Sequence, residues 1–167
     1  LSQKYRPLQN RKEGFAGKYG KQKDDLVEVV IGDSAKSLEL NAFRLCKNLK
    51  KAVISDINSE LINLYIVMRD KPHELKKLMN QHQCAHCQTY YYQVRESSYN
   101  TELEKAARFL YLNRTCFNGM YRVNKQGKFN VPIGTKNNCI YDIDLFDEYA
   151  QILKEANIFT DDFEKTI

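Results

Sequence analysis

The sequence predicts an α/β fold in which part of a sheet carries a helical insertion with a β-hairpin. Three observations support this. Two short β-branched segments lie at residues 27–31 and 52–55. Apolar residues at helical spacing follow in the middle of the chain, and a strand-like pair, Ile158-Phe159, lies near its end. The chain has 167 residues, of which 43% are hydrophobic, and it has only 7 Gly and 3 Pro. This composition is typical of a folded domain with an apolar core and not of a disordered chain.

The first elements are two strands and a helix. Residues 27–31 and 52–55 are β-branched runs that suit buried strands, and the second ends at Asp56. Ser59 is the expected N-cap of the helix that follows. Its apolar stripe is expected to be Leu61, Leu64, Tyr65 and Met68.

Three helices should complete the middle of the chain. Pro72 suits the first turn of a helix that continues through Leu75 and Leu78. Residues 88–97 are expected to be helical, and Thr101 with Glu104 forms a capping box at the start of the next helix. The buried stripe of that helix is expected to be Leu103, Ala106, Ala107 and Leu110.

A hairpin and a last helix precede the final strand. Residues 122–131 are expected to form the hairpin around Gln126-Gly127, and residues 144–156 the helix. We therefore expect three regions. Residues 1–60 begin an α/β domain, residues 61–140 form a helical subdomain with a hairpin at 121–131, and residues 141–167 return to the α/β domain.

Charge is unevenly distributed along the chain, although the net value is only +5. From Lys105 to Tyr141 there are seven basic residues and no Asp or Glu, whereas the chain from Tyr141 onward has eight acids and two lysines. Lys and Arg in such a stretch can replace the counterions of a phosphate backbone, so contact with nucleic acid is predicted. A solvated basic surface is the alternative.

Asp56 lies where a strand gives way to a helix. In doubly wound sheets a carboxylate at this point binds the ribose hydroxyls of a nucleoside cofactor, but a helix cap is an equally good interpretation. The glycine-rich loop that should precede it is reduced to Gly32, and residues 14–21 lack the spacing of a phosphate-binding loop.

A metal site and a membrane segment are not expected. Cys84-Ala-His-Cys87 supplies one ligand pair, and a structural zinc site needs a second. Five cysteines at irregular spacing favour ordinary thiols in a reducing, cytosolic compartment. The apolar runs are too short to cross a bilayer.

The segment before the hairpin carries side chains suited to reading bases. Arg122 can donate two parallel hydrogen bonds to guanine, and Asn118 can pair with adenine. Met120 and Pro132 have the size to contact a thymine methyl group or to wedge against a base step. From these residues alone, a hairpin that only packs on the helices is an equal alternative.

A resemblance to a known family decides between these alternatives. Residues 111–124 (Tyr-Leu-Asn-Arg-Thr-Cys-Phe-Asn-Gly-Met-Tyr-Arg-Val-Asn) and 127–134 (Gly-Lys-Phe-Asn-Val-Pro-Ile-Gly) closely resemble the target-recognition segment of Dam-type DNA adenine-N6 methyltransferases. Residues 56–65 resemble the family's cofactor motif, and residues 106–110 and 162–165 also fit. The resemblance covers about residues 52–167.

The resemblance implies a Rossmann-like methyltransferase sheet and a cytoplasmic, nucleoid-associated enzyme of a bacterium or phage. Such enzymes transfer a methyl group from S-adenosylmethionine to adenine in double-stranded DNA, commonly within GATC, and flip the target base. Asp56 would bind the cofactor ribose, and Asp162 and Phe163 would flank its adenine. A loose similarity to another family element adds four further cofactor-binding residues, namely Phe15, Gly17, Lys18 and Lys21.

The same resemblance implies a DNA interface with Arg122 as the main base-reading residue. Contacts with the DNA backbone are expected from Arg95, Lys128 and Asn130. The other interface residues are expected to be Arg114, Phe117, Asn118, Gly119, Met120, Asn124 and Pro132.

Two departures from the family pattern limit the expected activity. The family's catalytic Asp-Pro-Pro-Tyr is absent, because none of Pro7, Pro72 and Pro132 is followed by Pro or Tyr. It would be expected shortly beyond Ile167, so this chain alone should be inactive. The family's Phe-x-Gly-x-Gly loop is matched poorly by residues 29–35. A non-catalytic DNA-binding derivative is therefore the alternative, and a related endonuclease or regulator is disfavoured because no carboxylate cluster of nuclease type occurs.

Overall fold

The structure is a computed structural model that describes residues 28–31, 51–140 and 145–162. The chain divides into two compact units. Unit 1 comprises Leu1–Ile62 and Gln151–Ile167, and unit 2 comprises Asn63–Ala150. The described architecture is mixed α/β, with more helix than strand.

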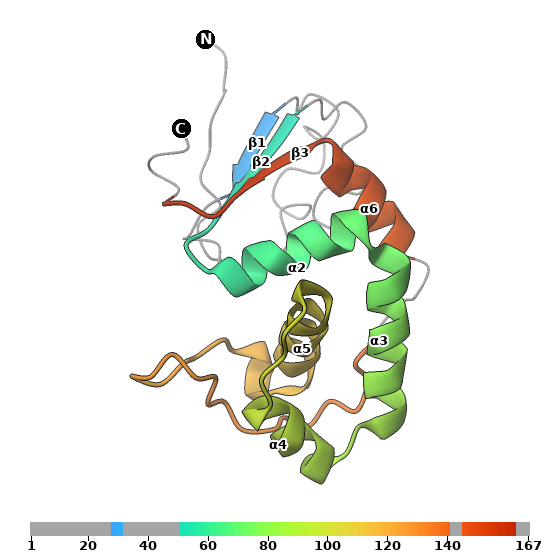
Figure 1. Cartoon of the computed structure of the whole chain (residues 1–167), viewed down its shortest axis with the longest axis vertical. Helices are drawn as coiled ribbons and strands as arrows, with labels where there is room; N and C mark the ends of the chain where they lie inside the picture. The colour runs from blue at the N-terminus through green and yellow to red at the C-terminus, as the bar shows by residue number, and fades with distance from the viewer. Residues whose placement is uncertain (1–27, 32–50, 141–144, 163–167) are drawn as a thin grey trace. The chain divides into compact units, whose positions relative to one another are not determined.

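Unit 1 contains a parallel sheet. Its described strands are β1 (Glu28–Ile31), β2 (Lys51–Ser55) and β3 (Ala156–Phe159), in the order β1-β2-β3 (Figure 1). Both pairings are parallel, with Val30 opposite Val53 and Ile54 opposite Ile158. The predicted strands are confirmed within the described residues. Val53 and Ile54 are buried, as expected for a β-branched strand in the centre of a sheet.

Three residues separate the end of β2 from the start of helix α2 (Ser59–Asp70). The side-chain Oδ1 of Asn58 accepts hydrogen bonds from the backbone N–H groups of Glu60 (3.1 Å) and Leu61 (3.4 Å). The prediction that Ser59 is the N-cap is therefore wrong. Asn58 has this role because its amide oxygen reaches the unpaired N–H groups of the first turn.

Unit 2 is built on α3 (Pro72–Ala85), α4 (Gln88–Glu96) and α5 (Glu102–Thr115). Pro72 lies in the first turn of α3, as predicted. The capping box of α5 is also confirmed, because the Glu104 N–H donates to Thr101 Oγ1 (3.2 Å) and the Thr101 N–H donates to Glu104 Oε2 (3.3 Å). The starts of α3 and α5 depend on residues within one helical turn, so the local sequence is enough to predict them.

The core of unit 2 combines apolar and polar side chains. Leu75, Met79, Tyr91 and Tyr111 are each fully buried. The ring of His82 stacks on Tyr111 with 4.7 Å between ring centroids. Helix α5 thus supplies a central aromatic side chain around which α3 and α4 pack.

A short 3₁₀ turn, η2 (Phe117–Gly119), follows α5 and leads into an extended segment. The prediction of a two-stranded hairpin at 121–131 is not confirmed. A single antiparallel bridge joins Val123 to Phe129, and the Asn124 N–H donates to the Lys128 carbonyl (2.9 Å). A second isolated bridge, between Cys116 and Ile133, joins the arms at their base, so the described segment has isolated bridges in place of two continuous strands. The last helix, α6 (Leu145–Lys154), is shorter than the predicted 144–156, because β3 starts at residue 156.

Candidate functional site

The carboxyl ends of β2 and β3 place several polar groups at one edge of the sheet. Ser55 lies opposite Phe159, and the Asp56 N–H donates to the Phe159 carbonyl (3.4 Å). The Ser55 hydroxyl donates to the Asp161 carbonyl (2.8 Å). Asp56 and the Asp161-Asp162 pair are therefore brought to the same edge, although Asp56 and Asp161 are 105 positions apart in the sequence. This is the edge at which parallel sheets bind nucleotide-like ligands.

The Asp56 carboxylate also shapes the turn between β2 and α2. Its Oδ1 accepts the Asn58 N–H at 2.7 Å. This interaction braces the turn, whereas the helix cap itself is Asn58. Ile57, between them, has 68% of its surface exposed. Ile57 was not among the predicted site residues, although a large apolar residue directly after a strand-end carboxylate is a signal for it.

Several predicted cofactor residues lie outside the described part of the chain. These are Phe15, Gly17, Lys18, Lys21 and Phe163. Their roles remain predictions. Within the described residues, Asp56 and Asp162 are the predicted cofactor-binding residues.

A second group of predicted residues lies on the segment that follows α5. The base of this segment is closed by backbone hydrogen bonds, from the Phe117 N–H to the Pro132 carbonyl (2.9 Å) and from the Gly134 N–H to the Thr115 carbonyl (2.7 Å). A Cβ at Gly134 would lie 2.5 Å from the Cys116 carbonyl oxygen, so only glycine fits there without a backbone shift. We call residues 117–132 the recognition loop.

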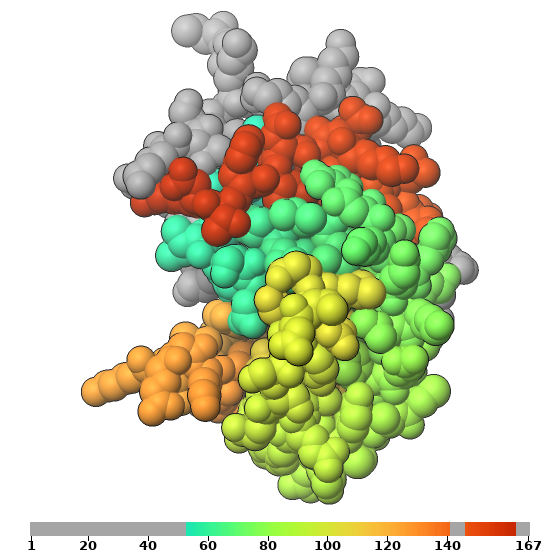
Figure 2. Space-filling view, in the orientation of Figure 1, coloured from blue at the N-terminus to red at the C-terminus, as the bar shows by residue number. Residues whose placement is uncertain are grey.

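The recognition loop is fixed to the helices on its return side. The Tyr91 hydroxyl, from α4, donates to the Val131 carbonyl at 3.0 Å in a buried position. Further along, the Arg114 Nη1 donates to the Cys139 carbonyl (2.8 Å), and Gln83 Oε1 accepts the Cys139 N–H (2.6 Å). These contacts hold the return end of the loop and the segment after it, while the middle of the loop projects from the helices (Figures 1 and 2).

The projecting part of the loop exposes aromatic and apolar side chains together with cations. Phe117 has 49% of its surface exposed, an unusual value for a phenylalanine of a folded unit. The other large apolar side chains exposed here are Met120, Tyr121 and Val123. Arg122, Lys125 and Lys128 are also exposed, and the loop contains no acid.

Arg122 is held by the opposite arm of the loop. Its Nε donates to Asn130 Oδ1 (2.7 Å) and its Nη2 to the Asn130 carbonyl (3.3 Å). Asn124 Oδ1 accepts the N–H groups of Gln126 (2.9 Å) and Lys128 (3.0 Å), which stabilises the turn. Gly127 supports the same turn with a φ of 75°.

Two predicted residues, Asn118 and Gly119, form the turn at the start of the recognition loop. Both have left-handed backbone conformations, with φ of 54° and 63°. The Asn113 side chain donates to the Gly119 carbonyl (3.1 Å), which stabilises this conformation. Asn tolerates the left-handed region better than other non-glycine residues, which gives Asn118 a structural reason independent of any base contact.

Arg95 and Arg114 both have partners within unit 2. Arg95 donates to the Glu96 carboxylate (2.8 Å) and lies over the Tyr92 ring, 4.7 Å from its centroid. Arg114 is bound to the Cys139 carbonyl, as described above. Contacts of these two residues with DNA stay predictions.

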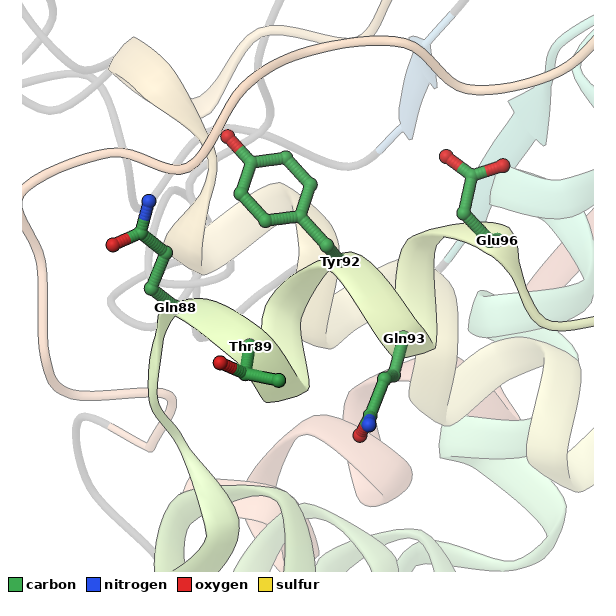
Figure 3. Close-up of a pocket in the computed structure, with 5 residues that line it drawn as sticks. All are labelled: Gln88, Thr89, Tyr92, Gln93 and Glu96. Carbon is green, nitrogen blue, oxygen red and sulfur yellow. The ribbon is translucent and has the colours of Figure 1, made fainter.

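A shallow hollow of about 580 Å³ lies along α4 (Figure 3). Its lining consists of Gln88, Thr89, Tyr92, Gln93 and Glu96. All five residues belong to one helix, and the hollow is wide open to solvent. It lacks the convergent groups from several elements that are typical of cofactor sites.

The described cysteine and histidine residues of unit 2 form helix-cap and core contacts and no metal site. Cys84 and Cys87 are exposed, and the Cys87 sulfur accepts the Tyr90 N–H (3.5 Å) at the start of α4. Burial lowers the pKa of His82 to about 4, and burial raises the pKa of Cys139 to about 11. No group of three or more metal-binding side chains occurs among the residues described, and none of the described helices is long and apolar enough to span a bilayer.

Comparison with known proteins decides the family. Residues 10–167 match the family of D12 class N6 adenine-specific DNA methyltransferases. The chain belongs to this family. The match includes both the strand-end edge around Asp56 and the recognition loop.

Individual relatives agree with this assignment. The chain is 42% identical over 127 residues to the type II methyltransferase M1.LlaDCHI of Lactococcus lactis, covering 71% of the chain and 45% of the relative. It is 37% identical over 128 residues to M.MjaIII of Methanocaldococcus jannaschii (69% and 44%). It is 29% identical over 150 residues to the DNA adenine methylase of Haemophilus influenzae (87% and 50%). The chain thus spans about half the length of the curated relatives it matches.

Proposed function

We propose that this D12-class chain supplies the cofactor-binding edge and the target-recognition unit of a DNA adenine-N6 methyltransferase. The observation that carries the proposal is the recognition loop. It lies within the family match, contains no acid, and presents Arg122 and exposed apolar side chains from a base closed by hydrogen bonds. Such a loop suits double-stranded DNA, because cations neutralise phosphates and a bidentate donor reads a base edge.

The side chains of the loop divide into two kinds of contact. Lys125 and Lys128 are exposed point charges that suit phosphate oxygens. Arg122 has the donor geometry for guanine, and the apolar Phe117 and Met120 can meet a thymine methyl group or support an unstacked base step. Recognition of GATC is part of the proposal and follows from the resemblance alone.

The strand-end edge fits S-adenosylmethionine in unit 1. The Asp56 carboxylate can accept hydrogen bonds from ribose hydroxyls, and the exposed Ile57 offers an apolar surface to an adenine ring. When bound, S-adenosylmethionine supplies the methyl group. A Rossmann-like sheet around this edge, with Asp162 and Phe163 near the adenine, is part of the same proposal.

Calorimetry with S-adenosylmethionine tests the cofactor edge. Asp56→Asn keeps an oxygen that can accept the Asn58 N–H but removes the charge, so it should weaken binding without unfolding the turn. Asp70→Asn, at an exposed site on α2, is the matched control and should bind as the unaltered chain does. If the unaltered chain shows no binding, the alternative of a non-catalytic DNA-binding derivative is favoured. The poor match of residues 29–35 to the family's glycine loop is the observation behind that alternative.

Methyl transfer by the chain alone is not expected, because its sequence contains no Asp-Pro-Pro-Tyr. The chain should transfer no label from S-adenosylmethionine to a GATC duplex, although it should bind that duplex. Measurable turnover would contradict this account of the missing motif. We expect the protein to act in the cytoplasm, where its DNA substrate lies.

A further inference from the structure

Arg122 and Asn130 are joined by three hydrogen bonds across the recognition loop. The Arg122 guanidinium donates through Nε to Asn130 Oδ1 (2.7 Å) and through Nη2 to the Asn130 carbonyl (3.3 Å). In return, the Asn130 N–H donates to the Arg122 carbonyl (3.1 Å). The Val123–Phe129 bridge lies directly beside this pair and keeps the two arms in register.

These bonds occupy one edge of the guanidinium. Arginine has five N–H donors, and Asn130 takes one on Nε and one on Nη2, which leaves three. Those three N–H groups have no partner among the residues that the structure describes. They include both N–H groups of Nη1, so the outer Nη1–Nη2 edge can donate two parallel hydrogen bonds to guanine O6 and N7.

We propose that Asn130 is a positioning residue that sets the specificity of Arg122. An exposed arginine samples many rotamers, and ordering it on binding weakens the complex. Asn130 orders the side chain beforehand through Nε and Nη2 and leaves its Nη1–Nη2 edge able to donate. The inference rests on the proposed DNA-reading function. It gives Asn130 a role different from the contact with the DNA backbone that the family resemblance implies.

The test compares affinity for two duplexes by fluorescence anisotropy. One contains a single GATC site, and in the other the G·C pairs of that site are replaced by A·T. Asn130→Ala should reduce the ratio of the two affinities about three- to tenfold, which corresponds to losing one ordering interaction. Its affinity for the second duplex should stay unchanged. Asn138→Ala, which replaces an exposed asparagine that follows the loop, is the control and should change neither affinity.

Two further variants separate positioning from other roles. Asn130→Asp keeps an oxygen acceptor for Arg122 Nε, so it should retain the affinity ratio while repulsion from phosphates weakens both complexes. In an Arg122→Ala background, Asn130→Ala should cause no further loss of discrimination. If Asn130→Ala does not fold, Asn130→Gln displaces the acceptor by one methylene and should show the same loss of ratio.

The remaining outcomes refute either the positioning role of Asn130 or the proposed DNA-reading function. An equal loss of affinity for both duplexes, with a shallower salt dependence, would make Asn130 a phosphate contact and overturn the positioning role. Discrimination that survives in Asn130→Ala would also overturn it and leave the proposed function intact. An unaltered chain that binds the two duplexes equally would refute the proposed function itself.

Discussion

Acid should destabilise unit 2 through His82. This side chain is 8% exposed, stacks on Tyr111 at 4.7 Å and shares a hydrogen bond with the Tyr90 hydroxyl (2.9 Å). The nearby titratable groups are Tyr90, Tyr111 and His86, and none of them is anionic near neutral pH. Burial without a carboxylate partner therefore lowers the pKa of His82 from 6.5 to about 4.

The sign and size of the effect follow from linkage. In the unfolded chain His82 takes up a proton near pH 6.5, whereas in the folded unit it does so only near pH 4. The contribution of neutral His82 to the free energy of unfolding is therefore fully present above about pH 6.5, and it is lost as the pH falls toward 4. These two values predict a loss of about 2 kcal/mol between pH 7 and pH 5, and about 3 kcal/mol below pH 4.

Urea denaturation at pH 7 and pH 5 measures this difference. His82→Phe keeps an aromatic ring against Tyr111 and removes the titrating group, so its free energy of unfolding should change much less over the same range. His73→Phe is the matched control, because His73 is an exposed residue of α3, and it should retain the full pH dependence. Equal pH dependence in the unaltered chain and in His82→Phe would refute the assignment to His82.

Two other predictions concern the attachment of the recognition loop. Tyr91→Phe leaves the buried Val131 carbonyl without its donor and should lower the free energy of unfolding by about 1–3 kcal/mol, as measured by urea denaturation; an unchanged midpoint would mean that this bond contributes nothing. Gly134→Ala places a Cβ 2.5 Å from the Cys116 carbonyl oxygen and should cost about 1–3 kcal/mol through a forced backbone shift. Its affinity for a GATC duplex should fall as well, and a variant with unaltered stability and affinity would contradict the described closure of the loop.

Local features were predictable from the sequence. The Thr101–Glu104 capping box and the start of α3 at Pro72 depend on neighbouring residues alone, and both are confirmed. Ser59 was a wrong choice of cap because both Asn58 and Ser59 are good capping residues, and propensity could not rank them. The Asp56 carboxylate, which binds the Asn58 N–H, is what places Asn58 at the cap.

Contacts between residues that are distant in the sequence could not be predicted from local sequence patterns. Gln126-Gly127 correctly indicated a turn, but the strands expected beside it are absent within the described loop. The arms meet again only at the base, where the Phe117 N–H donates to the Pro132 carbonyl, and the return arm is bound by Tyr91 of α4 through the Val131 carbonyl. The pairing of Arg122 with Asn130 likewise depends on the register of the two arms.

The most direct test of the central claim is the effect of Arg122→Ala on the discrimination between the GATC duplex and its A·T-substituted counterpart. If Arg122 reads a base, the variant should lose about 1–3 kcal/mol of discrimination and retain its affinity for the substituted duplex. Lys125→Ala, which removes a neighbouring charge, should instead weaken both complexes alike. An Arg122→Ala variant that weakens both complexes equally would contradict base reading by the recognition loop.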